Sequence, residues 1–226
     1  MQLTILGSGT ALPTHRRASA GYLVEWSEGA LLLDASAGTH MRALKAGLDP
    51  DRLRAVVLTH LHPDHTADLP ALLWARRQEK RTTTLAIVGP PGTAELVERF
   101  RGAYGEWLET PVRVDRLPWR GWSVVIDAFP ALHSGESVCL RIAADGRTLA
   151  YSGDTADCPG LRTACRDADL ALLECSSEEP KEGHMSPADC EEVVAAARPK
   201  RVLLTHLGPD VVPTLPAAED GLVVCL

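Results

Sequence analysis

The chain has 226 residues, of which 45% are hydrophobic, 23% charged and 4% aromatic, and its formal net charge is −7. This length and apolar content suffice to bury a core in one domain over residues 1–226, and they exclude a disordered chain. The apolar runs are too short to span a bilayer and no signal peptide is visible, so we expect a cytoplasmic protein without a membrane partner. The acidic balance argues against a protein that holds a long nucleic acid through bulk charge.

Short apolar strands and helices are interleaved along the chain, with no internal repeat. In chain order, we expect strands at Gln2–Leu6, Gly21–Glu25, Ala30–Asp34, Ala55–Thr59, Leu85–Val88, Val112–Leu117, Ser123–Phe129, Ser137–Ala143, Thr148–Ser152, Leu170–Glu174, Arg201–Thr205 and Gly221–Cys225. We expect helices at Gly38–Ala46, Thr66–Gln78, Thr93–Tyr104 and Pro187–Ala197. Because strands and helices are mixed in the same span, the sheets should be covered by helices, which is an α/β (α+β) architecture.

The strongest chemical signal is the sequence HLHPDH, which directly follows the buried strand at 55–59. Its imidazoles and carboxylate belong to His60, His62, His65 and Asp64. Alternate residues of an extended backbone face the same side, so His60 and His62 can reach one metal ion. Pro63, which lies between His62 and Asp64, forces a turn that directs Asp64 and His65 toward a second ion. Imidazole and carboxylate ligands suit zinc, with iron and manganese as alternatives.

Single polar residues follow three later strands and are candidates for the remaining ligands, namely His133, Asp154 and His206. Each has another interpretation when taken alone, because a histidine after a strand is often a surface residue and a Gly-Asp-Thr sequence is often only a turn. Their joint occurrence after the HLHPDH sequence favours a metal site with two ions.

These motifs resemble those of the metallo-β-lactamase superfamily along nearly the whole chain. The resemblance implies a four-layer αββα sandwich with a dinuclear site at one sheet edge. It assigns His60, His62 and His133 to one ion, Asp64, His65 and His206 to the other, and Asp154 to both. We also expect Asp64 to take part in catalysis.

Within the superfamily, the sequences LGSGT near the N-terminus and GHMS near position 184 are similar to those of ribonuclease Z and its small phosphodiesterase relatives. In that branch the histidine of the GHMS motif helps to protonate the leaving group, which implies the same catalytic role for His184. Ser186 is a good helix N-cap, and a helix N-terminus favours a bound phosphate. We therefore expect Ser186 to contact substrate, together with Arg16 and Arg17, whose loop faces substrate in the relatives.

Two departures from ribonuclease Z argue against tRNA as the substrate. The arm that grips tRNA lies between the third and fourth ligand motifs, but here His133 and Asp154 are only 21 positions apart. The tRNA-contacting motif P-x-K-x-R-N reads PTHRRA from Pro13 and lacks the lysine and the asparagine. The leading prediction is a dinuclear zinc phosphodiesterase that attacks a small cyclic or nucleotide diester with a hydroxide shared by the two ions.

Three other functions stay open. They are a lactone or thioester hydrolase on the same metals, an endonuclease acting on RNA 3′ ends like ribonuclease Z, and a non-enzymatic metal-binding or sensing domain. The pocket expected around His184 favours phosphodiesters, because lactones and thioesters gain less from an anion site. Relatives are often dimers, so the resemblance also implies a homodimer.

Residues outside these motifs have weaker signals. Asp34 follows a strand, and we expect it to hydrogen-bond a metal ligand from behind. The tryptophans Trp74, Trp107, Trp119 and Trp122 are candidates for a base-stacking pocket, although most tryptophans are simply core residues.

Overall fold

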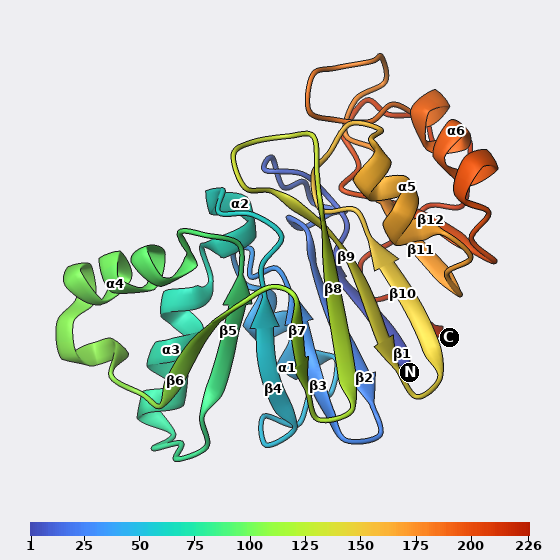
Figure 1. The fold of residues 1–226 in the computed structure, drawn as a ribbon. Helices are drawn as coiled ribbons and strands as arrows, with labels where there is room; N and C mark the ends of the chain where they lie inside the picture. Colours follow the sequence, from blue (N-terminus) through green and yellow to red (C-terminus); the bar gives the residue numbers. More distant parts are fainter.

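Two stacked β-sheets form the centre of the computed structural model, which describes residues 1–226 (Figure 1). The first sheet has the spatial order β13 (Val223–Cys225), β1 (Gln2–Gly7), β2 (Gly21–Trp26), β3 (Gly29–Leu33), β4 (Leu53–Val57), β5 (Leu85–Gly89) and β6 (Val112–Arg116). The second has the order β12 (Val202–Thr205), β11 (Leu170–Glu174), β10 (Arg147–Tyr151), β9 (Val138–Ala144), β8 (Val124–Pro130) and β7 (Trp119–Gly121).

Helices cover the outer faces of both sheets. The helical elements are α1 (Thr39–Lys45), α2 (Pro63–Thr66), α3 (Leu69–Gln78), α4 (Thr93–Tyr104), the 3₁₀ helix η1 (Gly105–Leu108), α5 (Pro159–Cys165) and α6 (Pro187–Ala197). Helices α1, α3 and α4 pack on the first sheet, and α5 and α6 pack on the second (Figure 1). The expected four-layer αββα sandwich is confirmed.

Three apolar layers hold the sandwich together, and the alternation of side chains along each strand divides residues between them. Tyr22 and Val24 of β2 lie between the two sheets, whereas the intervening Leu23 packs under the helices of the first sheet. In β11, Leu172 lies between the sheets and Leu173 faces α5 and α6. Strands buried on both faces have near-continuous apolar sequences, which is why they are easy to predict.

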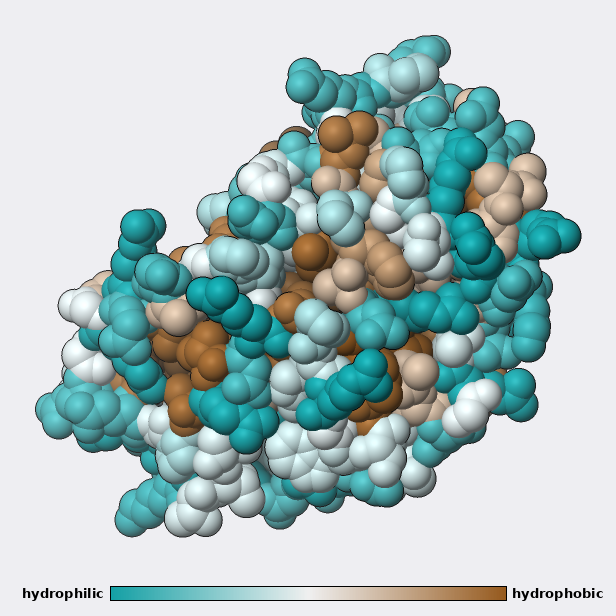
Figure 2. All heavy atoms as spheres, viewed as in Figure 1, coloured by the Kyte–Doolittle hydropathy of each residue, from teal (hydrophilic) through white to brown (hydrophobic).

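The surface agrees with this distribution. On the face seen in Figure 2, hydrophilic and neutral residues cover most of the molecule, and hydrophobic residues lie mainly in recesses between them. No helix is both long and apolar enough to cross a membrane.

The strand directions bring four loops to one edge of the sandwich. Strand β4 pairs in parallel with β3 and β5, and β11 pairs in parallel with β10 and β12. Strand β8 is antiparallel to β9, which is antiparallel to β10, so β8 and β10 run in the same direction. The carboxyl ends of β4, β8, β10 and β12 therefore supply the segments that carry the polar motifs.

The expected elements are found with small shifts at their ends, but four features differ. The helix expected at Thr66–Gln78 is two elements, α2 and α3, and the chain bends between them where Asp68 accepts hydrogen bonds from the backbone N–H groups of Gly38 and His40. Strand β7, helix α5 and the 3₁₀ helix η1 were not expected from the sequence. They are short, with three, seven and four residues, so their local patterns are weak.

Candidate metal centre and active site

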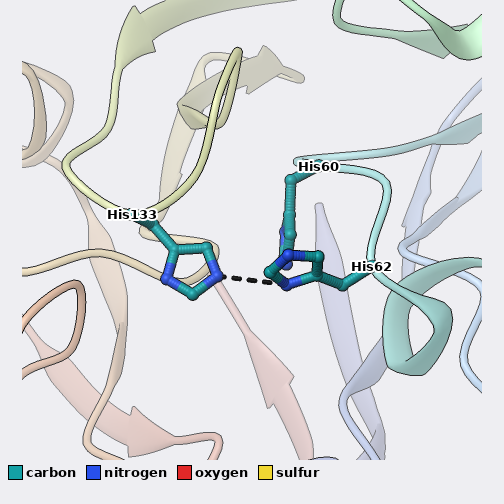
Figure 3. Close-up of side chains that lie close together, drawn as sticks. All are labelled: His60, His62 and His133. Atoms are coloured by element: carbon teal, nitrogen blue, oxygen red, sulfur yellow. Dashed lines mark hydrogen bonds between the residues drawn. The ribbon is translucent and has the colours of Figure 1, made fainter.

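Three histidines converge from two facing loops (Figure 3). His60 and His62 follow β4, and His133 follows β8 from the other sheet. Their ligand nitrogens all lie within 4.8 Å of one another, and His133 Nε2 is 3.2 Å from His62 Nδ1. Two residues that are alternate in an extended segment thus point to the same place, as expected from the sequence.

A second group lies beside the first and consists of Asp64, His65, Asp154 and His206, with ligand atoms again within 4.8 Å. Pro63 starts helix α2, and this turn directs Asp64 and His65 away from the first group. The Asp154 carboxylate lies 3.4 Å from both His65 Nε2 and His206 Nε2. It also lies 3.9 Å from nitrogens of the first group, so it stands between the two groups.

The chemistry of these side chains fits a divalent metal. Four of the buried side-chain atoms that have no hydrogen-bond partner belong to this cluster, and they are His60 Nε2, His65 Nε2, Asp154 Oδ1 and His206 Nδ1. Buried polar atoms are rarely left unpaired, so four at one place indicate a missing partner that accepts lone pairs. Among basic side chains, only histidines lie within 4.0 Å of the Asp154 carboxylate, and no lysine or arginine is there to neutralise it. A cation bound by imidazole and carboxylate meets both requirements.

His184 lies at the edge of this cluster and is supported by a buried carboxylate. Its Nδ1 donates a hydrogen bond of 2.8 Å to Glu174 Oε1, and the Glu174 side chain is fully buried. Backbone N–H groups of Thr155 and Ser176 also donate to Glu174. His184 has a nitrogen within 4.8 Å of ligand atoms of His133 and Asp154. The sequence assigns no role to Glu174, although a carboxylate at the end of an apolar strand is a signal that could have found it.

A β-lactamase superfamily domain matches residues 30–207, which is most of the chain. The chain belongs to the metallo-β-lactamase superfamily. Ribonuclease Z of Mycolicibacterium gilvum (strain PYR-GCK) is 31% identical, in an alignment that covers 97% of this chain and 87% of that protein. The superfamily match and this relative show that the protein is a hydrolytic enzyme.

Solved structures show the same fold. The short form of human tRNase Z superposes with a TM-score of 0.86 at 24% identity, covering all of this chain and 99% of that one. A diphosphatase from the PhnP family superposes with a TM-score of 0.80 at 19% identity, covering all of this chain and 97% of that one.

Burial and neighbouring charges shift the pKa values of the residues in the candidate metal centre. Burial, together with the neighbouring His65, lowers the pKa of His60 to about 3, so its imidazole is neutral and can ligate a metal. Burial opposes ionisation of Asp154, but the histidines around it hold its pKa well below the usual value. Burial also acts to lower the pKa of His65, yet Asp154 and Asp34 outweigh it and raise that pKa well above the usual value. Asp154 and Asp34 therefore keep their negative charge although they are buried, and a bound metal ion would take the place of the proton that they favour on His65.

Asp34 holds His65 from behind, as expected. The His65 Nδ1–H group donates to Asp34 Oδ2 over 2.8 Å, which leaves Nε2 directed at the cluster. The Tyr151 hydroxyl donates to the same oxygen over 2.7 Å, and the backbone N–H of Thr59 donates to Oδ1 over 2.8 Å. A carboxylate behind a ligating imidazole fixes its tautomer and its orientation.

Ser186 caps helix α6. Its hydroxyl accepts a hydrogen bond from the backbone N–H of Asp189, and the Asp189 carboxylate accepts from the Ser186 N–H in a capping box. The expected N-cap is confirmed. The side chain is 1% exposed and already has these partners, so its contact with substrate stays a prediction.

Arg16 and Arg17 line a cavity of about 780 Å³ that adjoins Leu207, the residue after His206. The Arg17 guanidinium donates to Ser8 Oγ and to a backbone carbonyl, so it holds the loop in place. The Arg16 side chain is exposed and makes no hydrogen bond or ion pair, so its guanidinium is the one available to a ligand.

Proposed function

We propose that the protein is a phosphodiesterase that uses two divalent metal ions, with zinc as the first choice and manganese or iron as alternatives. The residues that would hold one ion are His60, His62 and His133, those for the other are Asp64, His65 and His206, and Asp154 would serve both. Such ions supply acidification of water and stabilisation of negative charge on phosphate oxygens.

The observation that carries this proposal is the Glu174–His184 pair. The hydrogen bond to Glu174, more than any other contact, raises the pKa of His184 and so stabilises its protonated form. Because Nδ1 is occupied by Glu174, the other ring nitrogen is left to give its proton to a leaving oxygen. An alkoxide leaving from a phosphodiester needs such a proton.

Asp64 is the second catalytic residue in this proposal. Its side chain is 18% exposed, compared with 4% for Asp154, so it meets solvent within the candidate metal centre. The Asp64 carboxylate can therefore accept the proton of the attacking water, while His184 acts at the leaving oxygen.

The substrate we propose is a small cyclic or nucleotide phosphodiester. The free guanidinium of Arg16, in the cavity beside Leu207, offers a place for an anionic part of it. An RNA 3′-end endonuclease is the second candidate, because the curated relative at 31% identity is a ribonuclease Z. Between His133 and Asp154 the chain here forms only β9 and β10, joined by a two-residue turn, which leaves no arm to grip tRNA.

The experiment compares two diesters with different leaving groups, using zinc-loaded protein. The leaving group of bis-p-nitrophenyl phosphate is a stable anion, whereas a 2′,3′- or 3′,5′-cyclic nucleotide releases an alkoxide that must be protonated. His184→Ala should lower kcat for the cyclic nucleotide by about 10²- to 10⁴-fold and affect the nitrophenyl diester much less. His40→Ala, a histidine outside the cluster, is the matched control. Two outcomes would contradict the proposal. One is hydrolysis of lactones without hydrolysis of any diester, and the other is cleavage of precursor tRNA with no hydrolysis of small diesters.

A further inference from the structure

Gly183 and His184 are consecutive residues that contact two of the loops carrying candidate metal ligands. The backbone carbonyl of Gly183 accepts a hydrogen bond of 2.9 Å from His133 Nδ1, in the loop after β8. The imidazole of His184 is held by Glu174, whose Oε1 also accepts from the backbone N–H of Thr155, in the loop after β10. One dipeptide therefore joins the supports of ligands that follow two different strands.

The bond from His133 to Gly183 determines which nitrogen of His133 can bind a metal ion. A carbonyl oxygen only accepts, so Nδ1 carries the proton and Nε2 keeps its lone pair. Nε2 lies 3.2 Å from His62 Nδ1, and the His133 ring points at His62 in Figure 3. Metal-binding imidazoles are commonly fixed by such an acceptor behind them. Gly183 therefore does for His133 what Asp34 does for His65.

The backbone of Gly183 is packed directly against His133. Gly183 is buried and has φ +76°, in the left-handed region that residues with a Cβ rarely adopt. A Cβ added there would lie 3.0 Å from His133 Nδ1 and 3.4 Å from His133 Cα. The ring of the next residue, His184, meets the His133 ring edge to face, with centroids 4.8 Å apart. The dipeptide and His133 therefore cannot move independently.

The segment that leads to this dipeptide runs over the surface. Residues 178–182 are all exposed, whereas Gly183 is buried and His184 is half-buried. On the other side, the capping box of α6 begins at Ser186. An exposed segment opens at a low cost in free energy, so the place of His184 depends on the contacts at the buried end, which are those with His133 and Glu174.

We propose that Gly183 is a positioning residue that couples occupancy of the metal centre to the placement of His184. The His133 ring would be fixed by an ion at Nε2 and by Gly183 at Nδ1, and the fixed carbonyl holds the backbone that bears His184. Coupling between two sites is reciprocal, so the docked segment in turn raises the affinity for the ion. The part of this inference that concerns proton donation by His184 rests on the proposed phosphodiesterase function.

The first measurement is zinc affinity, which does not depend on turnover. Gly183→Ala adds a Cβ that presses on His133 and should weaken binding of one zinc ion about 10- to 100-fold, measured by competition with a chelating indicator. Gly146→Ala is the matched control, because Gly146 also has a positive φ (+69°) but a Cβ there meets nothing within 4 Å. It should be similarly destabilised in urea with a chelator present, and its zinc affinity should be unchanged.

A second variant keeps the test decisive if Gly183→Ala does not fold. Asparagine tolerates left-handed dihedral angles better than alanine does, and it carries the same Cβ. Gly183→Asn should therefore relieve the backbone strain and still show the loss of zinc affinity.

Hydrogen exchange of residues 176–186 measures the coupling itself. Zinc should slow exchange of this segment in the parent protein, and this slowing should be lost in Gly183→Ala even when zinc is saturating. The zinc-saturated variant should also lose about 10-fold more kcat for a cyclic nucleotide than for bis-p-nitrophenyl phosphate, because the proton donor is misplaced although the metals are bound.

Two results would overturn the inference. One is a zinc affinity that is unchanged in both Gly183→Ala and Gly183→Asn. The other is exchange of residues 176–186 that responds to zinc equally in the parent and in Gly183→Ala. If zinc affinity and exchange change as expected but no diester is hydrolysed, the proposed phosphodiesterase function fails and the coupling through Gly183 stands. Hydrolysis of both diesters by Gly183→Ala at the parental rates refutes only the coupling to His184.

Discussion

Asp34→Asn tests whether the carboxylate behind His65 stabilises the fold and orients the candidate metal centre. The carboxylate is fully buried, with His65 Nδ1 and the Tyr151 hydroxyl donating to Oδ2, and the N–H and hydroxyl of Thr59 donating to Oδ1. Asparagine replaces one of these oxygens by an NH₂ group, which is itself a donor. If the NH₂ group takes the place of Oδ2, His65 Nδ1 and the Tyr151 hydroxyl lose their acceptor. If it takes the place of Oδ1, the Thr59 N–H loses its acceptor, whereas the Thr59 hydroxyl also lies 3.0 Å from Oδ2 and can keep one.

The size of the effect follows from these contacts. A hydrogen bond to a charged group contributes about 1.5–3 kcal/mol, so losing one or two should lower the free energy of unfolding by about 1.5–6 kcal/mol. A domain of ordinary stability has only about 5–15 kcal/mol in total, so the loss is a large fraction of it. The His65 imidazole also loses the group that orients it, which should weaken zinc binding about 10- to 100-fold.

Urea unfolding in the presence of a chelator measures the free energy of unfolding without a contribution from metal. Zinc titration of the folded protein measures the zinc affinity. Tyr151→Phe is the partial control, because it removes one donor and leaves the carboxylate in place, so it should cost less. The reasoning is refuted if Asp34→Asn unfolds within about 1 kcal/mol of the parent and binds zinc equally tightly. If Asp34→Asn does not fold, a Tyr151→Phe variant as stable as the parent refutes it instead.

Three further predictions concern the cap, the metals and a surface carboxylate. Ser186→Ala removes the capping box of α6 and should lower the free energy of unfolding by about 1 kcal/mol, whereas a raised KM at unchanged stability would place the hydroxyl at the substrate. Chelation should lower Tm and zinc should restore it, because an ion at a hundred times its Kd contributes about 2.7 kcal/mol; a Tm indifferent to zinc would contradict binding to the folded state. Hydrogen bonds from Lys200 and Thr148 lower the pKa of Asp169 from 3.8 to about 2, so its stabilisation is present above pH 4 and is lost as the pH falls through 2. Asp169→Asn should therefore cost about 1 kcal/mol at pH 7 and almost nothing near pH 2, measured by urea unfolding; an equal cost at both would refute the ionic origin.

The sequence predicts which residues meet at the candidate metal centre because of a simple geometric regularity. Each expected ligand follows an apolar strand, and strands with the same direction end at the same edge, so a local pattern reports a long-range contact. Asp34 was predicted as a support for the same reason. Tyr151 was not, because a tyrosine at the end of a buried strand is indistinguishable from a core residue until its hydroxyl is seen to meet Asp34, 117 positions away.

The role of Glu174 could not be predicted from the sequence for a different reason. Its position at the end of β11 suggests a buried carboxylate, but its partner His184 lies across a charged loop whose path the sequence does not specify. The same limit applies to the tryptophans. Composition supplies candidates for stacking, but only the packing of α3 against η1 shows that Trp74 and Trp107 share a groove while Trp119 is buried.

The polar contacts beneath the cluster also couple the metal centre to the packing of the two sheets. Asp34 follows β3 of the first sheet and accepts from Tyr151 of the second, and Tyr22 of the first hydrogen-bonds Thr205 of the second over 2.8 Å. The rings of Tyr22 and Tyr151 meet edge to face, with centroids 5.0 Å apart. Since the candidate ligands also come from both sheets, an ion held there joins the same two layers as these buried contacts do. Metal binding should therefore stabilise the sandwich as a whole, and its loss should weaken the whole cooperative unit rather than loosen one loop.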